Sequence, residues 1–522
     1  FNIGAYDIYL TRGSLNTNGK SVTCGNFDSS ASNTRTLTLG ASTITLTAPA
    51  TSTMLLETTN LTFSGASSTI TTTGDLYIYA PSLTLGTISC ASLQIDSSLS
   101  CTTATIAGDG GQNDMLDINT ANAAVTFTVS GTLTITGYSA TDRVFVYNSG
   151  VVYGYQATIS AGTTSLTNVD FQDIAATGAA AWSGTSVANG GNNSGITFTS
   201  PVTRYWVGNG GNWSSTSHWS SSSGGSSGAS VPTCQDTVIF DANSISSGSQ
   251  TIYVDIARFG KDISFSAVTN NPTLDVSSIN AQFFGSLTLK AGMTTDTTDP
   301  QSIQFNGRSA ATLTTNTVDL DFPLFVVGYG ALLSLGSDLT FSTALTGLYV
   351  TGGEFSDNNY NITATAVFLG GEGPSDVVIM GNGTWTLTGT GDVLIAYPLL
   401  SLTPGTATIK ITNTSNTATT FQGGDLTYYN IWYSRGASTA SNTIVDSNTF
   451  NNFMTSGSAA HSFLFTTGIT TTVSSWTVSG TSGNLVTINS TTTGTHSLVK
   501  SGGGTISSDY LNIQHSVATP SS

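Results

Sequence analysis

The residues of this chain that could best form a catalytic site, judged by type and spacing, are aspartates. Asp319 and Asp321 stand two positions apart, so a β-strand would carry both carboxylates on one face. With Asp170 or Asp236 as a partner, they could form the carboxylate pair that hydrolyses a glycosidic bond. The chain has 29 acidic residues among 522, so such pairs arise by chance, and we predict that the protein is not an enzyme.

Ligands for a metal ion or cofactor would come from oxygen-rich or histidine-bearing segments. The stretch 109–117 has the oxygen density of a calcium loop but lacks the EF-hand pattern and its final glutamate. The four histidines are scattered without metal-ligand spacing: His218, His461, His496 and His515. We therefore predict a turn at 109–117, and neither a metal nor a cofactor.

Four cysteines are too few for a disulfide framework in a chain of this length. Cys90 and Cys101 lie 11 residues apart in similar strand patterns, which would place them on adjacent layers of a stacked fold. Two interpretations stay open, a disulfide bond and a pair of small buried apolar side chains. The second is favoured.

Aromatic side chains gather in the segment 204–244. Trp206, Trp213 and Trp219, three of the seven tryptophans, lie within 14 residues, and Tyr205 adjoins them. Exposed rings stack on sugars, so these four are candidate glycan-contact residues. The favoured interpretation is that they cap the open end of a stacked fold and are largely buried.

The elements that would position these residues are β-strands. Short runs of Thr, Val, Ile, Leu and Tyr alternate with period two between turns rich in Gly, Asn, Ser and Asp, as in 36–39, 43–47 and 132–136. No convincing amphipathic helix is evident. The chain is therefore predicted to be all-β.

Side-chain types recur in layers between residues 83 and 106. The recurring positions are Leu83 and Leu85, Leu93 and Ile95, Ala104 and Ile106, then Ile88 with Leu99 and Cys90 with Cys101. This spacing of 10 to 11 residues suits a solenoid with a coil of about 20 residues, although a β-sandwich also repeats strands at such intervals. We predict a right-handed parallel β-helix, or β-solenoid, with the first six of these residues buried and Leu85, Ile95 and Ile106 in one stack.

The pattern of the chain occurs twice. Residues 10–23 correspond to 350–363 at an offset of 340, and residues 169–177 correspond to 511–519 at an offset of 342. Fixed-period self-similarity points to an array architecture. A nearly constant offset over so long a stretch therefore indicates a tandem duplication of a whole module.

The duplication gives the predicted domain organisation. One solenoid module occupies 1–203, a Trp/Gly/Ser-rich opening or capping segment occupies 204–244, and a second module occupies 245–522. Module one lacks an aromatic opening segment before Phe1, and module two lacks a closing segment after Ser522. An uncapped solenoid exposes a sheet edge, so both residues are expected to be bounds of a fragment or joints to an adjacent module or subunit, unless 520–522 blunt the end.

Composition limits the class of protein. Charged residues make up 8% of the chain and hydrophobic ones 38%, which indicates an ordered core under a surface of hydroxyl and amide groups. The net charge of −17 argues against a nucleic-acid partner, whose phosphates attract Lys and Arg. No apolar run approaches the roughly 20 residues of a membrane span. We expect an extracellular or virion-surface location without membrane insertion.

The segment 206–241 resembles modules of phage tail-fibre-like proteins and of large bacterial β-helical adhesins. The shared residues are Trp206, Gly208, Gly210, Trp213, Trp219, Ser220, Val231, Pro232, Asp236, Val238, Phe240 and Asp241. Residues 181–195 are similar to the closing pattern of such modules, and 17–23 to their recurring rung. The resemblance implies a parallel β-helix used as a stalk, fibre or adhesin, and it carries over no catalytic residue.

Three functions are expected, in this order. The first is a structural component of an extracellular fibre, above all a phage tail fibre or virion appendage acting as a stiff stalk or in host attachment. The second is a bacterial surface adhesin or filament subunit, and the third is a polysaccharide depolymerase. The expected partners are further copies or adjacent fibre modules, and a cell-surface glycan.

Overall fold

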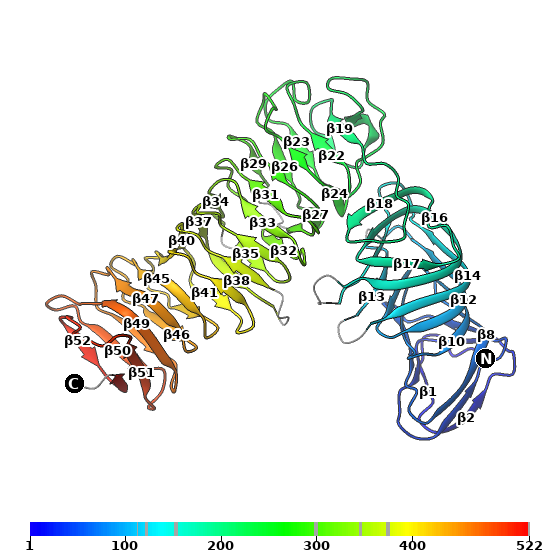
Figure 1. Ribbon diagram of the computed structural model, residues 1–522, viewed down its shortest axis with the longest axis horizontal. Coiled ribbons are helices and arrows are strands. Elements are labelled where there is room, and N and C mark those ends of the chain that lie inside the picture. The colour runs from blue at the N-terminus through cyan, green and yellow to red at the C-terminus, as the bar shows by residue number, and fades with distance from the viewer. Residues whose placement is uncertain are drawn as a thin grey trace. The chain divides into compact units, whose positions relative to one another are not determined.

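The computed structural model describes residues 1–111, 113–120, 124–150, 155–296, 301–343, 347–371 and 376–519. Parallel strands stack into a β-solenoid of about 21 turns, and 1% of the chain is helical (Figure 1). Among the described residues the helical turn is η1 (Thr216–His218). The predicted all-β solenoid is therefore confirmed.

The chain forms two compact units. Unit 1 contains residues 1–202 and 231–236, and unit 2 contains residues 203–230 and 237–522. The segment predicted to open or cap a module, 204–244, is thus divided between the two units. The finer three-part division stays a prediction.

Unit 1 is one parallel sheet that winds around its own core. Its 18 strands are β1 (Ile8–Tyr9), β2 (Gly13–Asn16), β3 (Val22–Cys24), β4 (Phe27–Ser29), β5 (Arg35–Thr38), β6 (Thr43–Leu46), β7 (Ser52–Leu56), β8 (Leu61–Thr71), β9 (Asp75–Tyr79), β10 (Thr84–Cys90), β11 (Ser92–Ile95), β12 (Leu99–Ala107), β13 (Met115–Ile118), β14 (Thr126–Thr136), β15 (Val144–Tyr147), β16 (Ala157–Gln172), β17 (Ile174–Gly178) and β18 (Thr185–Gly191). Inward positions of successive coils lie side by side, because the strands pair in parallel. One such column of buried side chains runs through Val22, Ile44, Ile70, Ile88, Ala104 and Leu133.

The predicted stack of Leu85, Ile95 and Ile106 is wrong. Ile95 on β11 lies between Ile78 and Ile118 of the neighbouring coils. Leu85 and Ile106 belong to β10 and β12, which pair with each other in a different register. The spacing of 10 to 11 residues is therefore a step from one face of a coil to the next, and both faces carry inward aliphatic residues because both border the same core.

Two related expectations are also corrected. Ile88 faces Ala104 and not Leu99, and Cys90 faces Ile106 and not Cys101. Of the six predicted core residues all but Leu83 are buried. Leu83 is only partly buried, because it precedes β10 at a turn, where the side chain is covered from one side.

Replacing Ile95 by alanine should lower the free energy of unfolding of unit 1 by about 2–5 kcal/mol, because the site is enclosed by Ile78 and Ile118 and cannot collapse around the lost atoms. Chemical denaturation followed by hydrogen–deuterium exchange in β11 would measure the change. Leu83→Ala is the matched control and should cost less, since Leu83 is partly open to water. Equal losses would contradict the assignment of Ile95 to a closed stack.

Coils of unit 2 contribute strands to as many as three faces, each a parallel ladder (Figure 1). One face holds β19 (Thr203–Trp206), β21 (Trp219–Ser220), β22 (Thr237–Ile239), β25 (Ile263–Ser264), β28 (Leu287–Thr288), β31 (Ala311–Thr314), β33 (Leu332–Leu335), β36 (Glu354–Ser356), β39 (Val377–Ile379) and β42 (Ser401–Thr403). The exception to parallel pairing here is β21, which runs antiparallel to β19.

The second face of unit 2 consists of two sheets in succession along the chain, and the third face consists of one sheet. A 4-stranded sheet of β20 (Gly211–Asn212), β23 (Thr251–Tyr253), β26 (Thr273–Asp275) and β29 (Thr294–Thr295) precedes a 9-stranded sheet of β34 (Leu339–Thr340), β37 (Ile362–Ala364), β40 (Thr384–Leu387), β43 (Thr408–Ile411), β45 (Thr427–Tyr433), β47 (Thr449–Thr455), β49 (Thr470–Thr477), β51 (His496–Lys500) and β53 (Ser516–Thr519). The last, 12-stranded sheet holds β24 (Arg258–Gly260), β27 (Ala281–Phe283), β30 (Ile303–Phe305), β32 (Leu324–Val326), β35 (Gly347–Val350), β38 (Ala366–Leu369), β41 (Gly391–Ala396), β44 (Thr419–Gln422), β46 (Ser441–Val445), β48 (His461–Phe465), β50 (Val486–Ser490) and β52 (Leu511–Ile513).

Outward-facing side chains also continue from coil to coil. The ring of Tyr349 is stacked between Phe325 at 4.5 Å and Phe368 at 4.7 Å between centroids. In unit 1 the hydroxyl groups of Thr87 and Thr103 lie 2.9 Å apart, within hydrogen-bond distance. Neighbouring coils are therefore joined by side chains on the outside as well as by the core.

The duplication is visible in the backbone of the two units. Three pairs of β15 with β16 recur at an offset of 342 in β50 with β52: Val144↔Val169, Phe145↔Asp170 and Val146↔Phe171 become Val486↔Leu511, Thr487↔Asn512 and Ile488↔Ile513. Asn168 and Tyr510, also 342 apart, have φ angles of 55° and 56°, and those of Asp173 and His515 are 60° and 46°. The unusual left-handed conformation of these residues makes the agreement specific, so the tandem repeat is confirmed.

Candidate functional site

The predicted aromatic cluster lies at the start of unit 2. Trp206 ends β19, Trp213 follows β20, and Trp219 begins β21. All three indole rings are 0% exposed. They pack on one another and on Phe240 and Phe259 with centroids 5.0 to 6.5 Å apart. The burial predicted for the three tryptophans is confirmed.

Backbone groups within the cluster bind two of the indole N–H groups. Trp206 Nε1 donates to Asn209 O at 2.5 Å, and Trp219 Nε1 donates to Trp213 O at 2.6 Å. Trp213 Nε1 is buried with no hydrogen-bond partner among the described residues. His218 stacks on Trp206 with centroids 4.7 Å apart. The cluster is therefore a closed packing unit.

Sugar binding by stacking needs an exposed ring face, and the three indoles present none. Tyr205, the fourth candidate, is partly buried on β19, where its backbone pairs with Ser220 and Ile239. The three tryptophans are therefore buried, as the capping interpretation requires, and a capping role stays a prediction. A glycan contact at Tyr205 stays a prediction.

Comparison with known proteins adds no relative to this picture. No protein-family model, curated protein or solved structure matches the chain. The likeness of 206–241 to fibre and adhesin modules thus rests on its motif residues alone. Among the described helices there is none of the length and apolarity that a membrane crossing requires.

Two carboxylates considered for catalysis make structural contacts in unit 1. Asp170 accepts a hydrogen bond from Arg143 Nε at 2.7 Å, and both side chains are buried. Asp236 accepts from Val202 N at 2.8 Å and from Thr233 N and Oγ1 at 2.7 Å. Asp170 is therefore paired with a buried arginine, and Asp236 joins the backbone at Val202 to that at Thr233.

Asp319 and Asp321 lie in unit 2, and the charge of Asp319 acts on Asp321. Asp319 accepts a hydrogen bond from Ser342 N at 3.0 Å. Burial, and secondly the charge of Asp319, raise the pKa of Asp321. The structure thus brings these two together, whereas Asp170 and Asp236 have partners of their own in the other unit.

Residues 109–114 of the oxygen-rich segment lie between β12 and β13, whereas 115–117 belong to β13, so the turn predicted for 109–117 does not extend over the whole segment. Gln112 lies outside the described residues. Asp114 Oδ2 accepts from Asp109 N at 3.1 Å, and Asp117 Oδ1 accepts from Ser149 N at 3.1 Å. Burial raises the pKa values of Asp114 and Asp117 to about 6. In the described part of the chain no group of three or more His, Cys, Asp and Glu side chains is placed to hold a metal ion.

Replacing Asp117 by asparagine should raise the free energy of unfolding at pH 7 by roughly 1–3 kcal/mol. The folded-state pKa of about 6 exceeds the ordinary value of 3.8, so the folded state binds this proton more tightly. Stability is therefore lost as pH rises from about 4 to about 6, and the charged carboxylate stays costly above that window. Denaturation curves between pH 3 and 8 should converge for Asp117→Asn and wild type below about pH 4.

The control for this titration is Asp392→Asn, because Asp392 is exposed. That variant should not show the gain in stability that Asp117→Asn shows above about pH 4. A constant difference between Asp117→Asn and wild type from pH 3 to pH 8 would contradict the burial effect.

The four cysteines are buried thiols. Burial raises the pKa of Cys24 to about 11 and that of Cys101 to about 12, and it raises the pKa of Cys90 as well. The disulfide alternative for Cys90 and Cys101 is wrong. The favoured interpretation, small side chains in the core, is confirmed.

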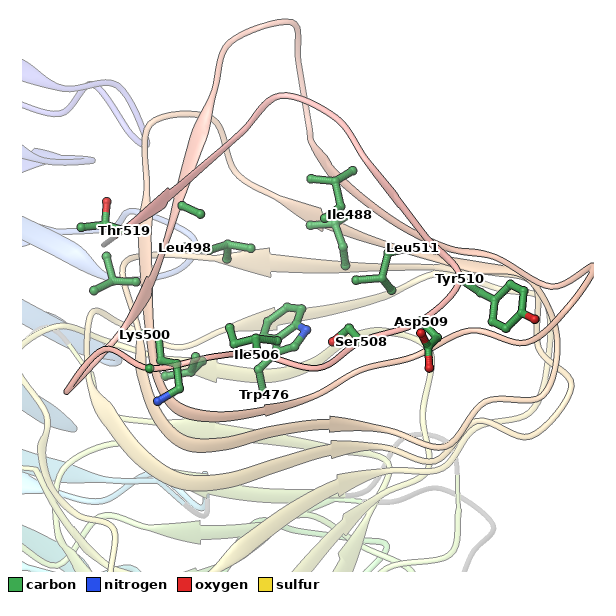
Figure 2. Close-up of a pocket in the computed structure, with 15 residues that line it drawn as sticks. Trp476, Ile488, Leu498, Lys500, Ile506, Ser508, Asp509, Tyr510, Leu511 and Thr519 are labelled. Carbon is green, nitrogen blue, oxygen red and sulfur yellow. The ribbon is translucent and has the colours of Figure 1, made fainter. Parts of the chain in front are cut away.

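Sequence reasoning missed a cavity of about 610 Å³ at the last described coil of unit 2. Its lining includes Val473, Trp476, Ile488, Leu498, Val499, Lys500, Ile506, Tyr510, Leu511, Ile513, Ala518 and Thr519. Figure 2 shows the side chains of Trp476, Leu498 and Leu511 around one open space. The signal that could have found these residues is the offset of 342, which aligns 511–519 with the coil 169–177 of unit 1.

Proposed function

We propose that the protein is a structural component of an extracellular fibre, a phage tail fibre or virion appendage in which it acts as a stiff stalk or in host attachment. The observation that carries the proposal is the continuity of side-chain columns from coil to coil. Inside, one column runs from Val22 to Leu133. Outside, rings such as Phe325, Tyr349 and Phe368 stack in the same direction.

Such columns give mechanical stiffness along each unit. Bending a coil away from its neighbour separates backbone hydrogen bonds, buried side chains and outer ladders at the same time, so the resistances add. The 12 Lys and Arg residues among 522 also leave few cleavage points for trypsin-like proteases. Both properties suit an object that stands outside a cell or particle.

Immunoelectron microscopy of native particles tests this function. Antibodies raised against the purified protein should label a filament or appendage on virions or on the cell surface of the source. Label confined to the cell interior would overturn the proposal. Binding to a glycan array would instead identify an adhesin. Release of reducing sugar from surface polysaccharide would identify a depolymerase.

The motif resemblance also supports one alternative, a bacterial adhesin. The burial of the three indoles removes them as a sugar platform, so an adhesin would have to use other residues, with Tyr205 as the candidate already named. A Tyr205→Ala variant that loses glycan binding on the array, with unchanged thermal stability, would favour this alternative.

A further inference from the structure

In unit 1 the coil formed by residues 169–177 is covered by the segment 178–199. Within that segment β18 extends the parallel sheet beside β16. The ring of Trp182 packs edge-on against Phe171, with centroids 6.5 Å apart, and its Nε1 donates to Thr177 O at 2.9 Å. Under this cover Phe171 is 0% exposed.

Unit 2 repeats the first part of this coil, 511–513, with the same backbone pairs as 169–171 but in a different surrounding. Ile513 and Val517, the counterparts of Phe171 and Ala175, are 59% and 47% exposed. Leu511 and Ile513 line the cavity of about 610 Å³, and Leu511 is labelled in Figure 2. The site that holds a tryptophan-bearing segment in unit 1 is thus an apolar hollow in unit 2.

We infer that this hollow is a docking site for a polypeptide segment with the chemistry of residues 178–199. The segment carries a tryptophan for the hollow and, sixteen positions later, a phenylalanine. In unit 1 that phenylalanine, Phe198, packs on Phe171 with centroids 6.5 Å apart. Between the two rings runs a strand that adds to the sheet edge, as in recognition by β-augmentation. The inference holds whether the protein serves a fibre or an adhesin.

Glycine in the docking segment is required by close approach. A Cβ atom at Gly195 would stand 2.1 Å from Ala176 O, too close for any side chain. Ala176 corresponds to Ala518 in unit 2; both lie on a strand that pairs in parallel with the preceding coil, Ala176 with Ile159 and Ala518 with Leu498. A segment that binds unit 2 by the same edge must therefore also carry glycine at this position.

One contact differs between the copies and defines the chemistry further. Arg143 donates to Ser186 Oγ and O at 2.7 Å in unit 1. Its counterpart in unit 2 is Leu485, which is 43% exposed. The docked segment is accordingly held in unit 2 by apolar contact and strand-edge hydrogen bonds, without a guanidinium clamp.

The first test uses the intact protein and a labelled synthetic peptide of residues 178–199, followed by fluorescence anisotropy. We expect saturable binding that falls about tenfold or more with the Trp182→Ala peptide and with the Gly195→Val peptide. On the protein side, Ile513→Asp should abolish binding. Leu399→Asp should not, because Leu399 is equally exposed, at 57%, and lies outside the hollow.

A second measurement removes the entropic cost of joining separate molecules. Residues 520–522 are replaced by a copy of 178–202, so that the segment is tethered beside its site. Hydrogen exchange of 511–519 should then slow about tenfold or more, and the same fusion with Trp182→Ala in the added copy should not slow it. The inference is overturned if the tethered segment leaves exchange unchanged, or if a scrambled peptide or a glycan binds as well. Either failure would leave the fibre proposal intact, since that is judged by microscopy.

Discussion

Replacing Asp170 by alanine is expected to lower the free energy of unfolding of unit 1 by about 3–5 kcal/mol. Asp170 and Arg143 form an ion pair at 2.7 Å in which both side chains are nearly inaccessible to water. Removal of the carboxylate leaves a buried guanidinium beside Ser186 and the carbonyl of Val169, which carry no negative charge to balance it. A buried charge without a counter-charge is costly. Denaturant unfolding, read by hydrogen exchange in β16, measures the loss.

The double variant Arg143→Met with Asp170→Leu distinguishes the net contribution of the ion pair to stability from the cost of leaving one buried charge without its partner. It should recover most of the loss, because similar apolar volume often substitutes for a buried pair without penalty. Asp75→Ala serves as the surface control, with a change expected within about 0.5 kcal/mol. An Asp170→Ala variant as stable as wild type would mean that the two side chains are not paired in solution.

Replacing Trp213 by alanine is expected to destabilise unit 2 by about 3–5 kcal/mol. The ring touches Trp206, Trp219 and Phe259 with centroids 5.0 to 6.0 Å away, so its loss opens a large cavity among rings that cannot move into it. Thermal unfolding and the shift of tryptophan emission to longer wavelength would report the change.

Phenylalanine substitutions provide the matched comparison within the cluster. Trp213→Phe should cost less than Trp219→Phe, because Trp219 Nε1 donates to a backbone carbonyl whereas Trp213 Nε1 is buried with no hydrogen-bond partner in the described structure. Loss of the Trp213 N–H removes a buried donor that has no partner, so it relieves a desolvation cost. Loss of the Trp219 N–H leaves the carbonyl oxygen that it binds unsatisfied. The reverse order of stability would show that ring shape alone governs the cluster.

Local pattern predicted the strands well, and long-range register poorly. Alternation identified inward residues such as Ile95 and Ile106 because side-chain direction has period two in any strand. Which of them stack depends on coil length, and that varies. Ile95 lies 17 residues after Ile78 and 23 before Ile118. The lengths of the corners, which no periodicity encodes, therefore decide the stacks.

The same limit applies to the candidate sites. Asp170 was weighed as a catalytic partner because its contact with Arg143, 27 positions earlier, depends on knowing one coil length. The tryptophan cluster was recognisable because its residues are close in sequence. The hollow of unit 2 joins Val473 and Trp476 to Leu511 and Ile513, residues far apart in the sequence that no local pattern links.

Parallel pairing between successive coils has a consequence for how this chain folds. Val326 pairs with Val350, and Val350 with Leu369, so each contact spans about one coil of a chain of 522 residues. A β-sandwich must instead join strands from distant parts of its sequence, which slows its folding. Here a folded coil offers its open edge to the next coil as soon as that coil has been synthesised. The solenoid can therefore fold coil by coil during translation, starting from any coil that forms first.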